Sequence, residues 1–174
     1  MPDFAAVTLH ALRSRMTGVF PAQVRAAIAD LSDEQLWWRP NESSNSIGNL
    51  ILHLTGSLNL YLNRNIGGIA YERDRAAEFA QREAVPKAEL LAKFDDMVAR
   101  AERTFDALTF EKLGEASPEP GMYDLVIEDV INALAHFSTH VGQILWIAKS
   151  VTDASMNDVW MKSHRREGAW KKPQ

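Results

Sequence analysis

Three histidines occupy positions from which their side chains could act on a single metal ion. His136 and His140 are four residues apart in the stretch ALAHFSTHVGQILWIAK, a spacing that places both imidazoles on one face of a helix, one turn apart. His53 lies in the apolar stretch NLILHLTGSL. Three imidazole ligands leave coordination positions open for water or a substrate. The spacing therefore predicts a metal site of the open, catalytic type.

A second interpretation of the same residues remains open at this point. The residues around the pair in the later stretch are apolar: Leu134, Phe137, Val141, Ile144 and Leu145. The pair is therefore expected to point inward, where imidazole nitrogens need polar partners. Backbone carbonyls or the histidines themselves could provide these partners without a metal. The other two histidines, His10 and His164, lie outside this arrangement and are predicted to be surface residues.

The absence of cysteine restricts the chemistry of the chain. Its 174 residues include no Cys, and 19 Lys plus Arg against 23 Asp plus Glu give a net charge of −4. A metal must therefore bind through nitrogen and oxygen, and any thiol nucleophile must come from another molecule. Mild acidity argues against nucleic-acid binding, and no stretch approaches the roughly 18 apolar residues of a membrane span. We expect a cytoplasmic protein that binds neither nucleic acid nor membrane.

Apolar residues repeat at helical spacing in four segments, about 3–30, 46–66, 86–108 and 125–150. Gly18 and Pro21 predict a kink or a break in the first segment, and Ser46 or Asn45 is expected to cap the second. The intervening segments are predicted as loops, with one helical turn at most between 69 and 85. Four long amphipathic helices predict an all-α four-helix bundle. We expect a single domain over residues 1–174, with residues 153–174 as a tail packed on the bundle.

Two sequence motifs resemble those of a known superfamily. The stretches NSIGNLILHL and HFSTHVGQI, on the second and fourth predicted helices, are similar to the signatures of the DinB/YfiT-like superfamily. The resemblance covers the chain in helix order and length and includes the Trp38-Arg39-Pro40 loop. It implies a four-helix bundle in which His53, His136 and His140 bind a divalent metal ion. A neutral three-nitrogen site suits Zn²⁺ or Ni²⁺.

Four polar residues lie at helical spacing from the predicted ligands: Asn49, Asp129, Asn132 and Gln143. Each is a candidate for orienting an imidazole or a water molecule on the metal. Two of them have alternative roles, since Asp129 could compensate a helix dipole and Gln143 could face a second subunit.

The superfamily resemblance implies a reaction class. Its characterised members include bacillithiol and mycothiol S-transferases and a thiol-dependent maleylpyruvate isomerase. The leading hypothesis is therefore S-transfer from a low-molecular-weight thiol, with Trp37, Trp38 and Tyr123 expected either to contact a small-molecule substrate or to cover the core. Two alternatives are a metal-dependent hydrolase, with Asp129 as a base, and a non-catalytic metal-binding homodimer. A homodimer is expected in the leading interpretation as well.

Overall fold

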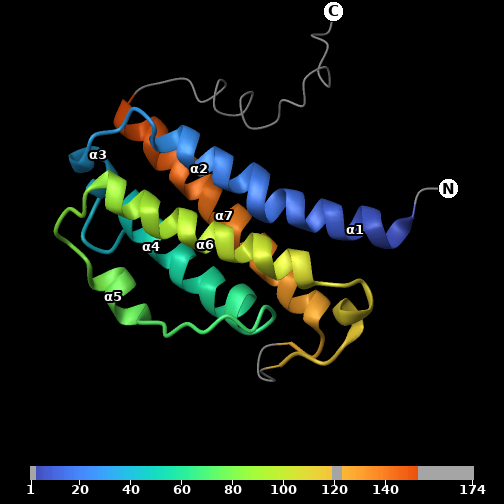
Figure 1. Cartoon of the computed structure of the whole chain (residues 1–174). Helices are drawn as coiled ribbons and strands as arrows, with labels where there is room; N and C mark the ends of the chain where they lie inside the picture. The colour runs from blue at the N-terminus through green and yellow to red at the C-terminus, as the bar shows by residue number, and fades with distance from the viewer. Residues whose placement is uncertain (1–2, 119–122, 153–174) are drawn as a thin grey trace, which may run out of the picture.

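A computed structural model describes residues 3–118 and 123–152 (Figure 1). Its helical elements are α1 (Phe4–Arg13), η1 (Ser14–Val19), α2 (Phe20–Ile28), α3 (Asp33–Trp37), α4 (Ile47–Leu58), η2 (Asn59–Arg64), α5 (Arg75–Ala80), α6 (Lys87–Ala107), η3 (Glu111–Gly114) and α7 (Val126–Thr152). Within these described ranges the extended pairing is a single isolated bridge between Ala116 and Leu125. The prediction of an all-α protein is confirmed.

The N-terminal segment is helical without interruption from α1 to α2, where the sequence predicted a kink or a break. The connecting element η1 is a π-helix that ends two residues before Pro21. Proline has no N–H to donate, and its ring crowds the carbonyl four residues earlier. The wider π turn relieves both problems, so the chain continues as helix.

Capping boxes fix where two of the helices begin. The Ser46 hydroxyl accepts a hydrogen bond from the Asn49 backbone at 3.1 Å, and the Asn49 side chain accepts one from the Ser46 backbone. The expected cap of α4 is thus Ser46. Ser32 and Gln35 form the same motif at the start of α3, in a segment predicted as loop. The Ser-x-x-Gln spacing is the sequence signal that identifies this short helix.

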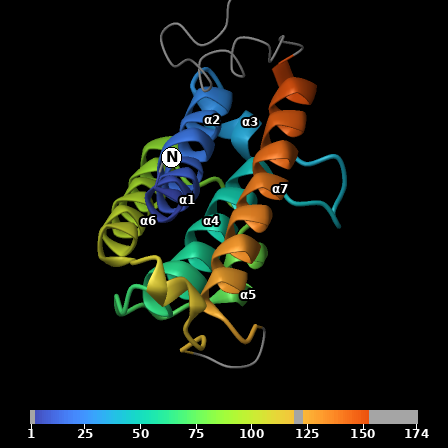
Figure 2. The same ribbon diagram turned by 90° about the vertical axis from the view of Figure 1, so that its right-hand side faces the viewer.

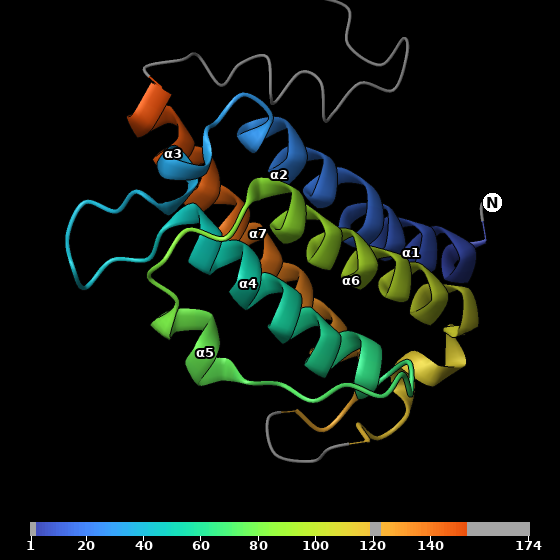
Figure 3. The same ribbon diagram turned by 60° about the vertical axis from the view of Figure 1, so that its left-hand side comes forward.

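Helix α4 packs against α5, α6 and α7 (Figure 2). Three apolar side chains of these helices are fully buried: Leu54 of α4, Phe94 of α6 and Phe137 of α7. Helix α3 docks on α4 through Trp37, whose ring occupies the space beside Gly48; a Cβ there would lie 2.6 Å from the ring. Figure 3 shows α5 beside α4, on the side away from α2. Two histidine-bearing helices, α4 and α7, are therefore direct neighbours.

Two expectations concern the ends of the chain. His10 is exposed on α1, as predicted. Residues 153–174, predicted to form a packed tail and containing His164, lie outside the described residues. No helix in the described part of the chain is both long enough and apolar enough to cross a lipid bilayer.

Candidate metal centre

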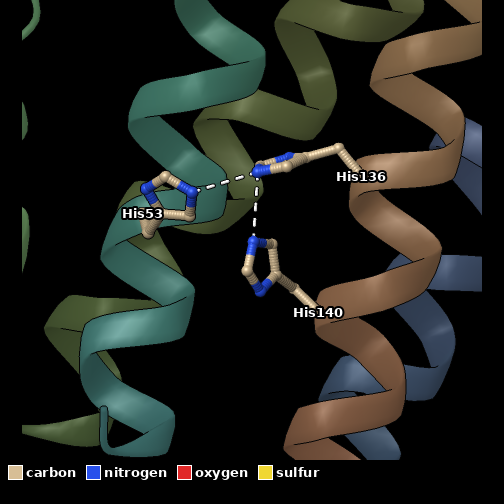
Figure 4. A group of neighbouring side chains, drawn as sticks. All are labelled: His53, His136 and His140. Carbon is tan, nitrogen blue, oxygen red and sulfur yellow. Dashed lines mark hydrogen bonds between the residues drawn. The ribbon is translucent and has the colours of Figure 1, made fainter. Parts of the chain in front are cut away.

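Three imidazoles converge between α4 and α7. His53 projects from α4, and His136 and His140 project toward it from α7 (Figure 4). The Nε2 atom of His136 lies 3.0 Å from Nε2 of His53 and 3.0 Å from Nε2 of His140. One nitrogen from each of the three residues falls within 4.8 Å of the others, so the group could hold one metal ion.

In His53 and His140, the hydrogen-bond partner of Nδ1 determines which ring nitrogen carries the proton. His53 Nδ1 lies 2.9 Å from the Glu78 carboxylate oxygen Oε2, and His140 Nδ1 lies 2.6 Å from the Gln143 amide oxygen Oε1. Both oxygens are acceptors, so each Nδ1 donates to them. The Arg73 Nη2 donor also lies 3.2 Å from His53 Nδ1, but the carboxylate contact is shorter and can form only if Nδ1 carries the proton. In the neutral rings the two Nε2 atoms then carry lone pairs, and both lone pairs face His136.

Hydrogen bonding alone leaves this group incompletely satisfied. A neutral His136 has one ring proton, so its Nε2 can donate to one of the two facing nitrogens at most. Its Nδ1 is buried without a hydrogen-bond partner among the described residues. A divalent cation accepts lone pairs from all three Nε2 atoms. At metal–nitrogen distances of about 2.0–2.1 Å, neighbouring ligand nitrogens are about 3.0–3.4 Å apart. The two contacts of His136, at 3.0 Å each, match this range, and all three nitrogens lie within 4.8 Å of one another. The donor set therefore fits a metal ion.

The electrostatics of the site favour neutral imidazoles, the form that binds metals. Burial, with smaller contributions from His140 and His53, lowers the pKa of His136 to about 4. Burial also lowers the pKa of His140. Both rings are therefore uncharged at neutral pH and keep the lone pairs that metal binding requires.

A buried ion pair holds His53 in place from the other side. The Arg73 guanidinium donates from Nε to Glu78 Oε1 at 2.7 Å and from Nη2 to Glu78 Oε2 at 2.8 Å. Both side chains are 7 % exposed. Burial would raise the pKa of Glu78, but the hydrogen bonds from Arg73 and His53 outweigh burial and lower it. An ionised Glu78 thus accepts a hydrogen bond from His53 Nδ1–H, which is the carboxylate–histidine arrangement that fixes and strengthens metal ligands.

Sequence reasoning missed Glu78 and Arg73, because it assigned their segment to a loop without a role. The structure holds that segment against α4 through Asn49, whose side-chain amide donates to the backbone carbonyls of Glu78 and Gln81 at 3.0 Å each. Gly56, one turn beyond His53, leaves the space that the Glu78 carboxylate fills. A glycine and an asparagine on the same face as His53 were the available signals.

The contact between Gly56 and Glu78 gives a direct prediction. In Gly56→Ala the new Cβ would overlap Glu78 Oε1, which Arg73 holds in place. We expect a loss of about 1–3 kcal/mol in the free energy of unfolding, as for other overpacked sites, together with weaker metal binding. Urea unfolding and metal titration measure the two effects. Gly142→Ala is the matched control, since its Cβ meets nothing within 4 Å and alanine favours a helix. Equal behaviour of the two variants would contradict the prediction.

The lowered pKa of His136 predicts how the stability of the metal-free protein depends on pH. The unfolded chain protonates this residue near its ordinary pKa of 6.5, whereas the folded protein resists protonation down to about 4. Because the unfolded state binds more protons in this window, stability is fully present above pH 6.5 and falls as the pH drops toward 4. Urea unfolding between pH 7.5 and 4.5 tests this. In His136→Gln the free energy of unfolding should depend less steeply on pH. An unchanged slope would argue against the lowered pKa of His136.

The other polar candidates have different surroundings. Gln143 contacts His140, and Asn132 lines a cavity of 240 Å³ beside His53 and His136. Asp129 instead accepts a hydrogen bond from the Ser117 hydroxyl. Asn49 acts on the site indirectly, through the backbone that carries Glu78.

The three aromatic candidates are spread over different surroundings. Trp37 is buried in the core and donates from Nε1 to the Val85 carbonyl at 3.0 Å. Trp38 is 40 % exposed at the end of α3, and Tyr123 is half-buried ahead of α7. None of them lines the 240 Å³ cavity in the described part of the chain. A second cavity of 520 Å³ lies between the loop before α4 and the part of α7 that carries Gln143.

The fold and the site together define an all-helical protein with a three-histidine group that could hold a metal ion. The model of a protein family of unknown function, DUF1572, matches residues 3–163, and the chain belongs to this family. A comparison with curated protein sequences found no match. The family description names no activity, so the function must be argued from the site.

Proposed function

We propose that this protein is a divalent-metal enzyme of the DinB/YfiT-like superfamily, built as a four-helix bundle, that transfers the sulfur of a low-molecular-weight thiol to an electrophile. The observation that carries the proposal is the convergence of three Nε2 atoms next to a cavity. Zn²⁺ and Ni²⁺ suit a neutral three-nitrogen donor set.

A bound divalent ion supplies one chemical property, a lower pKa of a coordinated thiol, so that the thiolate is available at neutral pH. The protein residues hold the ligand rings in position. Glu78, itself held by Arg73, accepts a hydrogen bond from Nδ1–H of His53, and the Gln143 amide oxygen accepts one from Nδ1–H of His140. These partners keep the Nε2 lone pairs directed into the site.

The lining of the cavity favours S-transfer over hydrolysis. Hydrolysis assisted by a general base requires a carboxylate or histidine within reach of the attacking water. No carboxylate of the described residues lines the 240 Å³ cavity, and the two histidines that line it, His53 and His136, are the proposed metal ligands. Glu78 forms an ion pair with Arg73. Asp129 is the base in the hydrolase hypothesis, but its carboxylate accepts a hydrogen bond from the Ser117 hydroxyl. A thiol, whose ordinary pKa is about 8.5, needs a much smaller shift than water to ionise at neutral pH without a separate base.

The thiol in this reaction comes from outside, because the chain contains no cysteine. In the proposed reaction the thiol loses its proton to solvent and the thiolate sulfur attacks an electrophilic carbon. A carbon–sulfur bond forms as the bond to the leaving group breaks, and the leaving group departs with the bonding electrons. The balance requires no oxidant or reductant.

Monochlorobimane provides a test, since displacement of its chloride by a thiolate produces fluorescence. Protein loaded with Zn²⁺ or Ni²⁺ is mixed with monochlorobimane and with cysteine, glutathione or another small thiol in turn. We expect at least one thiol to react about tenfold faster than without protein, and the acceleration to disappear in His53→Ala. Ester cleavage without a thiol would instead indicate a hydrolase, and metal binding with neither activity would indicate a non-catalytic metal-binding protein.

A further inference from the structure

The cavity beside His53 and His136 is lined by two arginines, Arg73 and Arg75. Its volume is 240 Å³, and its other polar lining residues are Ser57, Tyr61, Arg73, Arg75 and Asn132. This space is large enough to hold several water molecules or a small metabolite. Two arginines and no carboxylate of the described residues reach the cavity, and an ion on the three histidines would add further positive charge.

The two arginines differ in how their charge is balanced. Arg73 is neutralised by the bidentate contact with Glu78. Arg75 forms no ion pair within the described part of the chain, and its guanidinium lies over the Phe79 ring at 5.0 Å from the centroid. The same Phe79 ring lies 4.7 Å from the His53 ring. Arg75 therefore carries a charge without a paired carboxylate in the described part of the chain. The Phe79 ring lies between this guanidinium and the His53 ring.

We infer that this cavity binds an anionic group of the substrate, and that the thiol of the reaction is a small one carrying a carboxylate or phosphate. The inference rests on the proposed function for the identity of the reacting group. Arg75 is the specificity residue, because a guanidinium fork pairs well with planar or tetrahedral oxyanions and stacking on Phe79 orders it beforehand. Asn132 and Tyr61 line the cavity as further hydrogen-bonding groups.

The test compares two thiols that differ only in charge, 3-mercaptopropionate and 3-mercaptopropionamide. Each is titrated into Co²⁺-loaded protein, whose visible spectrum changes when a thiolate binds the metal. We expect the acid to bind about tenfold more tightly than the amide in the unmodified protein. In Arg75→Gln the Kd of the acid should rise about tenfold, whereas that of the amide should not change. Arg75→Lys should restore part of the difference.

The control is Lys93→Gln, which removes the same charge from an exposed lysine that is paired with Glu89 on α6. It should leave both Kd values unchanged. Equal binding of the two thiols, or equal weakening of both by Arg75→Gln, overturns the inference. Arg75 is exposed, so loss of folding is not expected to interfere.

A further arm separates this inference from the proposed function. If neither thiol alters the Co²⁺ spectrum, the proposed thiol chemistry fails, and anion binding is then judged by calorimetric titration with propionate and with inorganic phosphate. Binding of one of them that is lost in Arg75→Gln supports the anion site and identifies its preferred anion. Absence of binding by both overturns it.

Discussion

Replacing Glu78 by alanine is expected to lower the free energy of unfolding by about 3–5 kcal/mol. The change leaves Arg73, whose side chain is 7 % exposed, as a buried charge without its carboxylate. It also removes the acceptor of the His53 Nδ1 proton, so the ring can rotate and change tautomer. Loss of such an outer partner weakens metal binding by roughly 10–100-fold. Urea unfolding of the metal-free protein and metal titration measure the two losses separately.

Two further variants define the origin of these losses. Glu78→Gln keeps the size of the side chain and an oxygen acceptor but removes the charge. Its free energy of unfolding and its metal affinity should therefore lie between those of the unmodified protein and of Glu78→Ala. Glu83→Ala removes an exposed carboxylate five residues after Glu78 and should change stability by less than about 0.5 kcal/mol. If Glu78→Ala were as stable as Glu83→Ala, the ion pair with Arg73 would have no structural importance.

His136→Ala is expected to abolish stoichiometric metal binding. His136 is the residue whose Nε2 contacts both of the other rings, so its loss leaves two separated nitrogens from different helices. We expect the affinity to fall by more than about 100-fold, beyond the effect of losing an outer partner. Metal analysis after dialysis against buffered Zn²⁺ or Ni²⁺, in protein purified without a chelating resin, provides the measurement.

The metal-free form of this variant supplies an independent readout. Its helical content should equal that of the unmodified protein, because the mutation removes a half-buried ring whose Nδ1 has no partner and whose Nε2 contacts only the two other histidines among the described residues. His10→Ala, on an exposed position of α1, serves as the control and should retain its metal. Full metal occupancy in His136→Ala would refute the three-histidine site.

The long helices could be predicted because each carries its own signals. The apolar period locates α6 and α7, Ser46 marks the start of α4, and the spacing of His136 and His140 places both rings on one face. These features depend on residues within a few turns of one another. The convergence of His53 with the pair required the additional expectation that its helix packs against theirs.

The support for His53 could not be predicted in the same way. Glu78 lies 25 residues after His53 in a charged segment without helical periodicity, and it reaches the site only because Asn49 anchors its backbone on α4. Such a contact depends on how two elements pack, which local sequence does not encode. Trp37 illustrates the opposite case: the sequence left open whether this aromatic contacts a substrate or covers the core, and the structure places it in the core beside Gly48.

His53 and His136 are 83 residues apart in the sequence but in direct contact in the fold. Bringing such distant residues together costs loop-closure entropy, so their contact forms only with the complete tertiary structure. A ligand that binds them jointly binds the native state and not the unfolded chain. At a hundredfold excess over its Kd, it adds about 2.7 kcal/mol to stability. If the three histidines hold a metal ion, occupancy of the site would report on global folding, and the supply of the ion would set how much of the protein survives thermal stress.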